Sequence, residues 1–284
     1  MMMKNNNPIF VLGGPRSGTT MLRLMITAHK RVCIPPECGF ALWLYSAYKD
    51  WDSSAGYNSF IADLVRTKKF ETWGLAKEDI IRVIKSSNPL NYADLVSCVY
   101  EAYAYKMGRS NVQWGDKNNF YLNYISELRS LYPDAYVIFI IRDPRDVFSS
   151  YKEVMSRNVK ADYAPDLTVD AGEFCNEWND VVDKVDLSYA LFADKLLVVR
   201  YEDLVINPES EARKICNHID IHYDNRMLAF YDINDEPDTF SSWKGNTYRP
   251  IASSSVGRYK TCLQKEEIKI IDEKLRGGLL RWSY

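Results

Sequence analysis

A glycine-rich segment near the start of the chain, residues 13–20 (GGPRSGTT), has the composition of an anion-binding loop. It follows a short apolar run and precedes a helical pattern, so backbone N–H groups and a helix N-terminus would face one ligand. The spacing is that of a phosphate loop, GxxxxGK[ST], except that Thr19 stands where nucleotide triphosphatases carry lysine. Without that lysine an ATP-hydrolysing interpretation loses its main cation, and Arg16 supplies a positive charge within the loop instead. A glycine turn that binds no ligand is the alternative.

A second candidate anion site lies in residues 140–150 (IIRDPRDVFSS). Arg142 ends an apolar run that predicts a central strand, and open α/β sheets bind ligands at the carboxyl ends of their strands. Asp143 and Pro144 form an N-cap with proline at the first helical position. Ser150 would then lie about 10 Å further along the helix, where its hydroxyl and the arginine charge hold a phosphate together. Taken alone, the segment is explained better by a capped helix with a surface arginine.

Three short apolar runs predict the buried parallel strands that would position these segments. They are Ile9–Leu12, Ala135–Ile141 and Leu196–Val199. Each run is followed by a helix signal, and further helical patterns cover about 170–193 and 265–275. The alternation predicts an α/β fold with a doubly wound parallel sheet, P-loop-like, with helical insertions.

Neither a repeat nor a low-complexity linker divides the sequence, so we expect a single domain over residues 1–284. A helical insertion at about 40–107 is dense in aromatic residues. Its rings at positions 43–57 would line an acceptor pocket or, more simply, form a core stripe. The segment at about 222–256 has no clear period and carries acidic loop residues, and we expect it to be a mobile flap.

The charge balance limits the partners of the chain. Lys and Arg total 36 against 38 Asp and Glu, so the net charge is -2, which excludes a generic basic nucleic-acid binder. An anion must therefore be held by a few placed residues. The apolar run at 9–12 is far too short for a signal sequence or a membrane span. We expect a cytoplasmic protein without a membrane span and without a nucleic-acid partner.

Four segments together resemble the sulfotransferases that use 3′-phosphoadenylyl sulfate (PAPS) as donor. GGPRSGTT is similar to their 5′-phosphosulfate loop, and RDPRDVFSSY (142–151) resembles their 3′-phosphate motif, including its arginine-to-serine interval of eight. VVRYEDL (198–204) and SSVGRYKTCL (254–263) are similar to the segments that follow. The four occur in family order over nearly the whole chain, in a pattern most similar to bacterial and tyrosylprotein-type members.

The resemblance implies which residues bind the donor. The 3′-phosphate would be held by Arg142 and Ser150, with Arg258 in the element that closes over it. Tyr201 would line the nucleotide site. The 5′-phosphosulfate would contact five residues of the loop, namely Arg16, Ser17, Gly18, Thr19 and Thr20.

The resemblance also implies the catalytic residues. Many cytosolic members carry a histidine shortly after a lysine, but residues 115–119 (GDKNN) have none. Glu37 falls 17 residues after Thr20, as the base does in the tyrosylprotein-type pattern. Two prolines before Glu37 would aim it into the site, although a lone glutamate in a loop is ordinarily just exposed. Lys117 and Arg16 would stabilise the transferring group. Alternatively, Lys117 would simply form an ion pair with its neighbour Asp116.

These residues predict a sulfotransferase that moves a sulfuryl group from PAPS to an acceptor hydroxyl, with no metal required. The acceptor is expected to be a small molecule, a carbohydrate or a lipid, with phenols and steroids among the candidates. The sequence chooses neither among them nor an oligomeric state. Two other classes stay open, a P-loop kinase or ATPase that needs ATP and Mg²⁺, and a catalytically silent nucleotide-binding protein.

Overall fold

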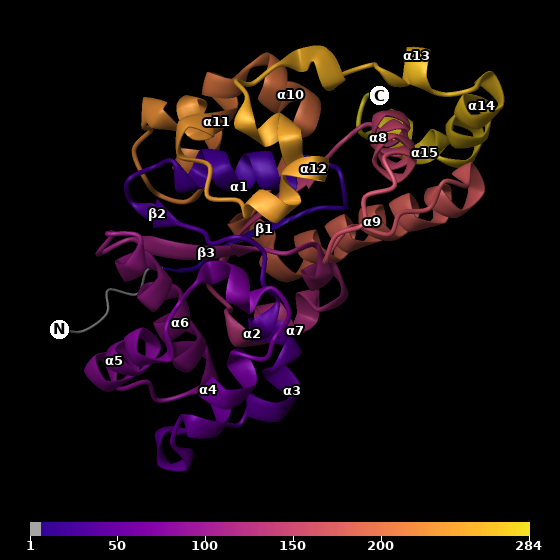
Figure 1. The fold of residues 1–284 in the computed structure, drawn as a ribbon. Coiled ribbons are helices and arrows are strands. Elements are labelled where there is room, and N and C mark those ends of the chain that lie inside the picture. Colours follow the sequence, from indigo (N-terminus) through magenta and orange to yellow (C-terminus); the bar gives the residue numbers. More distant parts are fainter. Residues whose placement is uncertain (1–6) are drawn as a thin grey trace.

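The computed structural model describes residues 7–284. A five-stranded sheet lies at its centre, with the strand order β2-β3-β1-β4-β5 and parallel pairing throughout (Figure 1). The three predicted strands are present and two more are added. In chain order the strands are β1 (Ile9–Leu12), β2 (Val32–Cys33), β3 (Gln113–Lys117), β4 (Tyr136–Ile141) and β5 (Leu196–Arg200).

The two strands that the sequence does not predict both lack an apolar run, which is the feature that predicts a buried strand. β2 has only two residues, which is too short for a pattern. β3 (QWGDK) pairs with both β1 and β2, yet it contains no apolar run, because Asp116 and Lys117 occupy buried positions in it. Charged residues have replaced the apolar signal of a central strand at this position.

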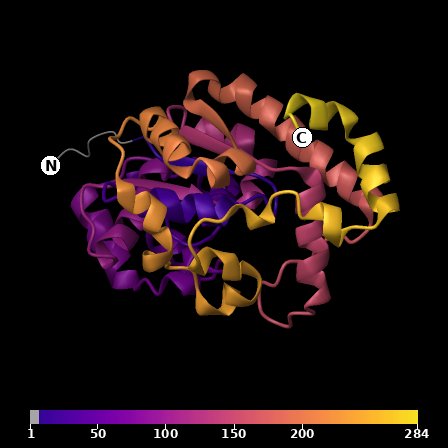
Figure 2. The ribbon, with the colours of Figure 1, turned by 90° about the horizontal axis from the view of Figure 1, so that it is seen from above.

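Helices cover both faces of the sheet, so the predicted doubly wound α/β fold is confirmed (Figures 1 and 2). Ile9 and Val11 of β1 point to one face, while Phe10 and Leu12 point to the other. The first face packs against α1 (Thr19–Thr27), α10 (Tyr201–Ile206) and α11 (Pro208–His218). The second packs against α6 (Tyr92–Lys106), α7 (Ile125–Leu131) and α9 (Ala171–Phe192).

Short helices fill the region between β2 and β3. They are α2 (Phe40–Trp43), α3 (Tyr45–Tyr48), α4 (Asn58–Leu64) and α5 (Lys77–Ser87). Four of the aromatic rings predicted either for a pocket or for a core stripe pack against the core from this region: Tyr45, Tyr48, Trp51 and Tyr57. The fifth, Trp43, packs against Phe120, with 5.5 Å between the ring centroids.

A third apolar cluster joins the C-terminal helices to the helix that follows β4. That helix, α8 (Pro144–Ser156), begins as predicted, with Asp143 as N-cap accepting a hydrogen bond from the Arg145 backbone N–H. The remaining helices of this region are α13 (Tyr259–Cys262), α14 (Lys265–Lys274) and α15 (Arg276–Arg281).

The segment predicted as a flap consists of short helical turns that lie over α1 (Figure 1). Its elements are η5 (Asn225–Ile233), η6 (Asp238–Phe240), α12 (Ser241–Lys244), η7 (Gly245–Tyr248) and η8 (Ser253–Ser255). Its mobility stays a prediction.

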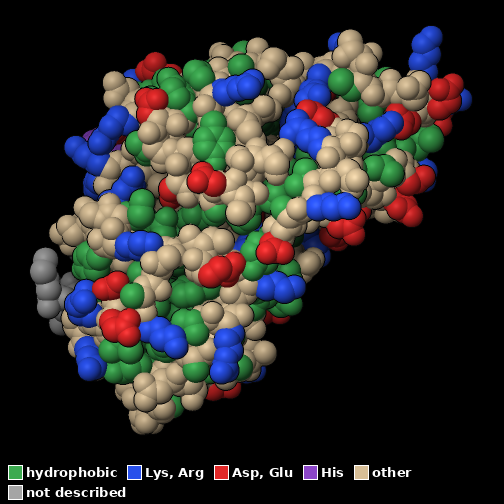
Figure 3. Space-filling model, in the orientation of Figure 1, with side chains coloured by type: hydrophobic (Ala, Val, Ile, Leu, Met, Phe, Trp, Pro, Cys, Tyr) green, Lys and Arg blue, Asp and Glu red, His purple; other side chains and the backbone are tan. Residues whose placement is uncertain are grey.

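The topology brings two strand–helix loops to one place. From β1 the chain crosses to β2 and β3 on one side of the sheet, and it then returns to β4 and β5 on the other. The order of strands therefore reverses between β1 and β4, and the loops after these strands open at the same edge. Ligands of open α/β sheets bind at this kind of switch point. On the face drawn in Figure 3, basic and acidic side chains are interspersed.

Candidate active site

A cavity of about 710 Å³ opens at this edge of the sheet. Pockets of about 300–1,000 Å³ hold drug-sized ligands, so its size suits a nucleotide. All but one of the site residues predicted from the sequence line it: Arg16, Gly18, Thr19, Thr20, Glu37, Lys117, Arg142, Ser150, Tyr201 and Arg258. Ser17 instead lines a smaller cavity of about 200 Å³ behind the loop.

The glycine-rich loop has the backbone geometry of an anion cradle. α1 starts at Thr19, and no side chain of the described chain caps it, so its first N–H groups lack intrahelical partners at the cavity. Gly18 has φ 99°, and a Cβ there would lie 2.6 Å from Cδ2 of Tyr201. Arg16 also takes a left-handed conformation, with φ 62°. The loop therefore needs glycine at position 18, both for its turn and for its contact with the tyrosine.

The structure joins the two predicted anion sites. The Nε of Arg16 donates to the Oγ of Ser150 at 3.0 Å, and an Nη of Arg142 donates to the backbone oxygen of Arg16 at 3.1 Å. Burial and the nearby charge of Arg142 lower the pKa of Arg16 to about 10. A depressed arginine pKa indicates positive charge that is incompletely balanced, and an anion would balance it.

Arg142 has hydrogen-bond donors to spare. Its guanidinium lies 4.2 Å from the ring centroid of Tyr201, and its second Nη donates to the Ser255 backbone oxygen at 2.8 Å. Its Nε is buried without a hydrogen-bond partner among the residues described. Because a buried unpaired donor costs free energy, this nitrogen fits an acceptor supplied by a ligand.

A buried carboxylate fixes the segment that carries Arg258. Asp146, in the first turn of α8, accepts hydrogen bonds from the backbone N–H groups of Gly257 at 2.7 Å and Tyr259 at 2.9 Å. Arg258 is thereby held in the lining of the cavity. An Nη of Arg258 pairs with Oε2 of Glu153 at 2.8 Å.

Glu153 and Arg157 line this end of the cavity, and sequence reasoning missed both. They form an ion pair with each other along α8. Together with Asp146 and Ser150 they are spaced four, three and four residues apart, which puts all of them on one face of the helix. That periodicity is the signal that could have identified them once the helix was predicted.

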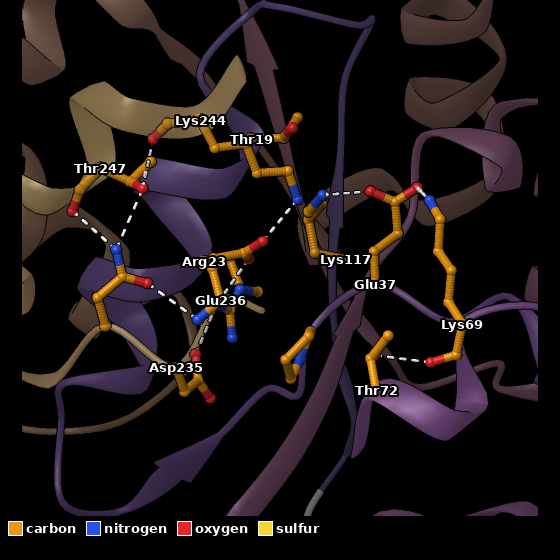
Figure 4. Close-up of polar contacts among 12 residues, drawn as sticks. Thr19, Arg23, Glu37, Lys69, Thr72, Lys117, Asp235, Glu236, Lys244 and Thr247 are labelled. Atoms are coloured by element: carbon orange, nitrogen blue, oxygen red, sulfur yellow. Dashed lines mark hydrogen bonds and ion pairs between the residues drawn. The ribbon is translucent and has the colours of Figure 1, made fainter. Parts of the chain in front are cut away.

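Glu37 lies in a firmly held loop and lines the cavity at the end away from Arg258 (Figure 4). The Nε1 of Trp73 donates to the Pro36 backbone oxygen at 2.8 Å, and an Nη of Arg23 donates to the Ile34 backbone oxygen at 2.7 Å. These bonds supplement the two prolines of the loop. The carboxylate therefore has a defined position.

Two lysines pair with Glu37, one on each oxygen. Nζ of Lys117 lies 2.8 Å from Oε2, and Nζ of Lys69 lies 3.0 Å from Oε1. Burial alone would raise the pKa of Glu37, but the charges of Lys117, Lys69 and Lys244 hold it well below its usual range. The carboxylate is therefore ionised at neutral pH, which is the form that accepts a proton.

Asp116 does not form the ion pair with Lys117 that the sequence suggested. Successive residues of a strand point to opposite faces, so Asp116 points away from the cavity. Its carboxylate accepts hydrogen bonds from the hydroxyls of Tyr100 and Tyr121 instead. Burial raises the pKa of Asp116 to about 7. Its role is in the core.

An aromatic wall, which we define as Tyr163, Phe240 and Trp243, lines the cavity beside Glu37. Phe240 packs against both other rings, at centroid distances of 6.4 Å and 5.3 Å. Nζ of Lys69 lies 5.7 Å and 5.8 Å from the centroids of Tyr163 and Phe240. No sequence signal marks the wall, because its residues come from two segments without regular periodicity.

Two of the three histidines are engaged away from the cavity. Nε2 of His29 is hydrogen-bonded to the His222 backbone oxygen at 2.9 Å, and Nε2 of His218 to that of Val137 at 3.2 Å. Burial lowers the pKa of both rings. Neither ring lines the cavity, so neither is positioned as its base.

Sequence comparisons point to one family. The model of the sulfotransferase family matches residues 8–225. A putative protein-tyrosine sulfotransferase of Caenorhabditis briggsae is 26% identical over 272 residues, which cover 93% of this chain and 85% of the relative. Protein-tyrosine sulfotransferase 1 of Danio rerio is 25% identical over 226 residues, which cover 78% of this chain. The match spans 55% of that zebrafish protein.

Solved structures share the fold. A sulfotransferase domain from the curacin biosynthetic pathway superposes with a TM-score of 0.61 at 19% identity, covering 95% of this chain and 97% of the domain. A mouse sulfotransferase complexed with PAP, the 3′,5′-bisphosphate product of PAPS, superposes with a TM-score of 0.50 at 13% identity, covering 97% and 86%. At these identities the likeness establishes the fold.

The predicted cytoplasmic location is wrong. The relatives matched in Danio rerio and Drosophila melanogaster are protein-tyrosine sulfotransferases, which are Golgi membrane enzymes. The prediction rested on the lack of an export signal, and a missing signal does not fix a compartment. Within residues 7–284, no helix combines the length and the apolar character that crossing a bilayer requires.

Proposed function

The chain belongs to the sulfotransferase family, and on this premise we propose that the enzyme transfers a sulfuryl group from PAPS to a phenolic hydroxyl. One observation carries the proposal. The two anion sites, the ionised Glu37 and the aromatic wall all line the same cavity. A donor with phosphates at both ends and an aromatic acceptor would therefore meet at the carboxylate.

The donor would lie between the two anion sites. The N-terminus of α1, with Arg16 and Thr19, would hold the 5′-phosphosulfate. Arg142 and Ser150 would hold the 3′-phosphate, for which the unpaired Nε of the arginine is one available donor. The mouse protein with this fold is complexed with PAP, which supports a PAPS-type donor.

The transfer would proceed in line, with Glu37 as general base. Its carboxylate takes the proton of the acceptor hydroxyl as the acceptor oxygen forms a bond to sulfur. The bond between sulfur and the 5′-phosphate oxygen breaks, and its electron pair stays on that oxygen. The products are a sulfate ester and PAP. Lys117 and Arg16 would meet the charge that builds on the departing phosphate, so we propose that no metal is required.

Donor binding would also make Glu37 a better base. In the structure the charge of Lys117 keeps the pKa of Glu37 low. When Lys117 also interacts with the phosphosulfate, its charge stabilises the Glu37 carboxylate less. The pKa of Glu37 then rises toward the operating pH, where proton transfer is most effective. Lys69 stays on the other oxygen and keeps the carboxylate aimed.

The aromatic wall favours a phenol over the other acceptor classes predicted from the sequence. An aromatic acceptor ring can form offset-stacked or edge-to-face pairs with these side chains, each worth about 0.5–1.5 kcal/mol beyond the area that it buries. Two relatives are named as protein-tyrosine sulfotransferases, and the side chain of tyrosine is a phenol, which supports this acceptor class. A small phenol and a tyrosine in a peptide present the same reacting group, and an experiment must separate them.

The first experiment is calorimetric titration of the protein with PAP and, separately, with ATP–Mg²⁺. Micromolar PAP binding without an ATP response supports the donor, whereas ATP–Mg²⁺ binding without PAP binding overturns it in favour of a kinase or ATPase. PAP release from PAPS is then measured in EDTA with p-nitrophenol, a tyrosine-containing peptide, a sterol and an oligosaccharide. Turnover with neither phenol contradicts the acceptor class, and PAP binding without any turnover identifies a silent nucleotide-binding protein.

A further inference from the structure

Lys244, which no sequence motif marks, reaches the same point of the cavity as Lys117. Figure 4 shows both side chains ending beside Thr19, although one comes from β3 and the other from the end of α12. Each ammonium is held from behind by a carboxylate. Lys117 pairs with Glu37 at 2.8 Å, and Lys244 pairs with Glu236 at 2.6 Å.

Lys244 owes its position to α1, the helix that begins at the phosphosulfate loop. Arg23, one turn into α1, pairs with Oε1 of Glu236 at 2.7 Å and with Asp235 at 2.6 Å. Glu236 has a fully buried side chain and holds Lys244 with its other oxygen, Oε2. Burial would raise the pKa of Glu236, but Arg23 and Lys244 lower it to about 2. The carboxylate is therefore ionised and bridges the two cations.

The repulsion between the ammonium groups of Lys117 and Lys244 costs free energy. Lys117 and Lys244 have side chains that are only 2% and 10% exposed, so water screens them poorly. Burial, followed by the charge of Lys117, lowers the pKa of Lys244 to about 8. An anion between the two groups would remove their repulsion. The position beside Thr19 is where the 5′-phosphosulfate would place its sulfuryl end.

We propose that Lys244 is a further catalytic residue, which contacts the sulfuryl oxygens from the side opposite Lys117. This inference rests on the proposed function. As the bond from the acceptor oxygen to sulfur forms and the bond from sulfur to the 5′-phosphate oxygen breaks, Lys244 stabilises the charge on the sulfuryl oxygens. It takes no proton in the step, because the acceptor proton goes to Glu37.

PAP lacks the sulfuryl group, so it separates a sulfuryl contact from a general loss of the fold. We expect Lys244→Met to lower kcat by about 10²-fold, as the loss of one transition-state donor does, while the Kd of PAP changes less than about twofold. Lys214→Met is the matched control, since Lys214 also pairs with a glutamate at 2.6 Å but is largely exposed on α11 outside the cavity. The control should leave kcat and Kd unchanged.

The pH profile of kcat/KM gives a second readout. Because the pKa of Lys244 is lowered to about 8, kcat/KM should fall above that pH, which gives the profile an alkaline limb. Lys244→Arg should move this alkaline limb to higher pH, because arginine keeps its proton. The charged groups that face Lys244 also include Glu236, Glu37 and Lys117, so each variant is compared with wild type in the same buffers. If Lys244→Met fails to fold, the arginine variant carries the test alone.

An unchanged kcat in Lys244→Met, a fall in PAP affinity as large as the fall in kcat/KM, or an unmoved alkaline limb in Lys244→Arg would each overturn the inference. A failure of wild type to bind PAP is a different result. It would overturn the proposed function itself. The PAP titration of wild type therefore precedes the variants.

Discussion

The two ends of the cavity attract anions with different side chains. At the end where the sulfuryl group would transfer, the cations are the lysines 69, 117 and 244, held by Glu37 and Glu236. At the end where the 3′-phosphate would rest, the cations are the arginines 142, 157 and 258, with Glu153 between the last two. A lysine ammonium is a compact charge that can follow a group as it moves, whereas an arginine fork matches a stationary phosphate. The difference separates a reacting end from a holding end.

The two ends also differ in exposure. The side chains of Lys117 and Lys244 are 2% and 10% exposed, whereas those of Glu153 and Arg157 are 35% and 44% exposed. Exposed ion pairs contribute little free energy, and breaking a buried pair leaves an uncompensated charge. The exposed pair of the holding end should therefore give the smallest effect, whereas Arg142 at the same end is buried and should give a large one. Four predictions follow this order.

The largest effect is expected at Glu37. Glu37→Gln removes the proton acceptor but keeps the shape of the side chain, so kcat should fall by about 10²–10⁴-fold. The Kd of PAP should stay within a few fold of wild type, because in the proposed mechanism the carboxylate contacts the acceptor hydroxyl and not the nucleotide. Steady-state kinetics and PAP titration measure the two quantities. Full activity in this variant would remove Glu37 from the mechanism.

Arg142→Ala should give the next largest effect. It should weaken the binding of PAP rather than slow the chemical step. The variant loses charge-assisted hydrogen bonds to the 3′-phosphate, each worth about 1.5–3 kcal/mol, so PAP should bind about 10–100-fold more weakly. Adenosine 5′-phosphate, which lacks the 3′-phosphate, should lose much less affinity. An unchanged Kd of PAP, with circular dichroism like that of wild type, would mean that the second anion site is wrongly placed.

Lys69→Met should alter the pH dependence more than the maximal rate. Lys69 helps to hold the pKa of Glu37 below its usual range, so its removal raises that pKa. The carboxylate then takes up a proton at a higher pH, and the acid limb of kcat/KM should move toward neutrality. Lys68→Met is the control, since Lys68 is exposed and does not line the cavity. Superimposable profiles for wild type and Lys69→Met would refute the coupling.

The smallest effect is expected at the exposed pair of the holding end. Glu153→Gln frees Arg157 and Arg258 from their carboxylate, so PAP should bind about two- to fivefold more tightly at low salt. The gain should shrink as salt is added. Glu209→Gln breaks the comparable pair with Arg213 on α11, away from the cavity, and should not change the affinity. A gain of the same size in both variants would make the effect one of net charge alone.

The holding end could be predicted from the sequence better than the reacting end. Arg142, Asp143 and Ser150 belong to one strand–helix unit, whose apolar run and capping residues carry their own signals. Glu153 and Arg157 follow on the same helix face, so helical periodicity gives them too. Local sequence carries signals for these residues because one strand–helix unit positions them, whereas Arg258 comes from a separate segment to which only the family resemblance pointed.

The reacting end draws its residues from segments that only the tertiary structure brings together. Lys117 lies in a strand without an apolar run, and the resemblance to a family pointed to it where periodicity did not. Lys69 and Lys244 come from short turns far apart in the chain, and Tyr163 lies in a loop. Their side chains line the same cavity through long-range packing, which local sequence patterns do not encode.

The aromatic wall and the second sulfuryl contact share one short stretch of chain. Residues 240–244 supply Phe240 and Trp243 to the wall, and they end at Lys244. Evolution of a new acceptor preference by exchange of this stretch would therefore carry a penalty in rate, because the lysine would shift with the rings. Leu167 lines the same cavity from another segment and has no ion pair to disturb. Directed changes of acceptor range are best begun there.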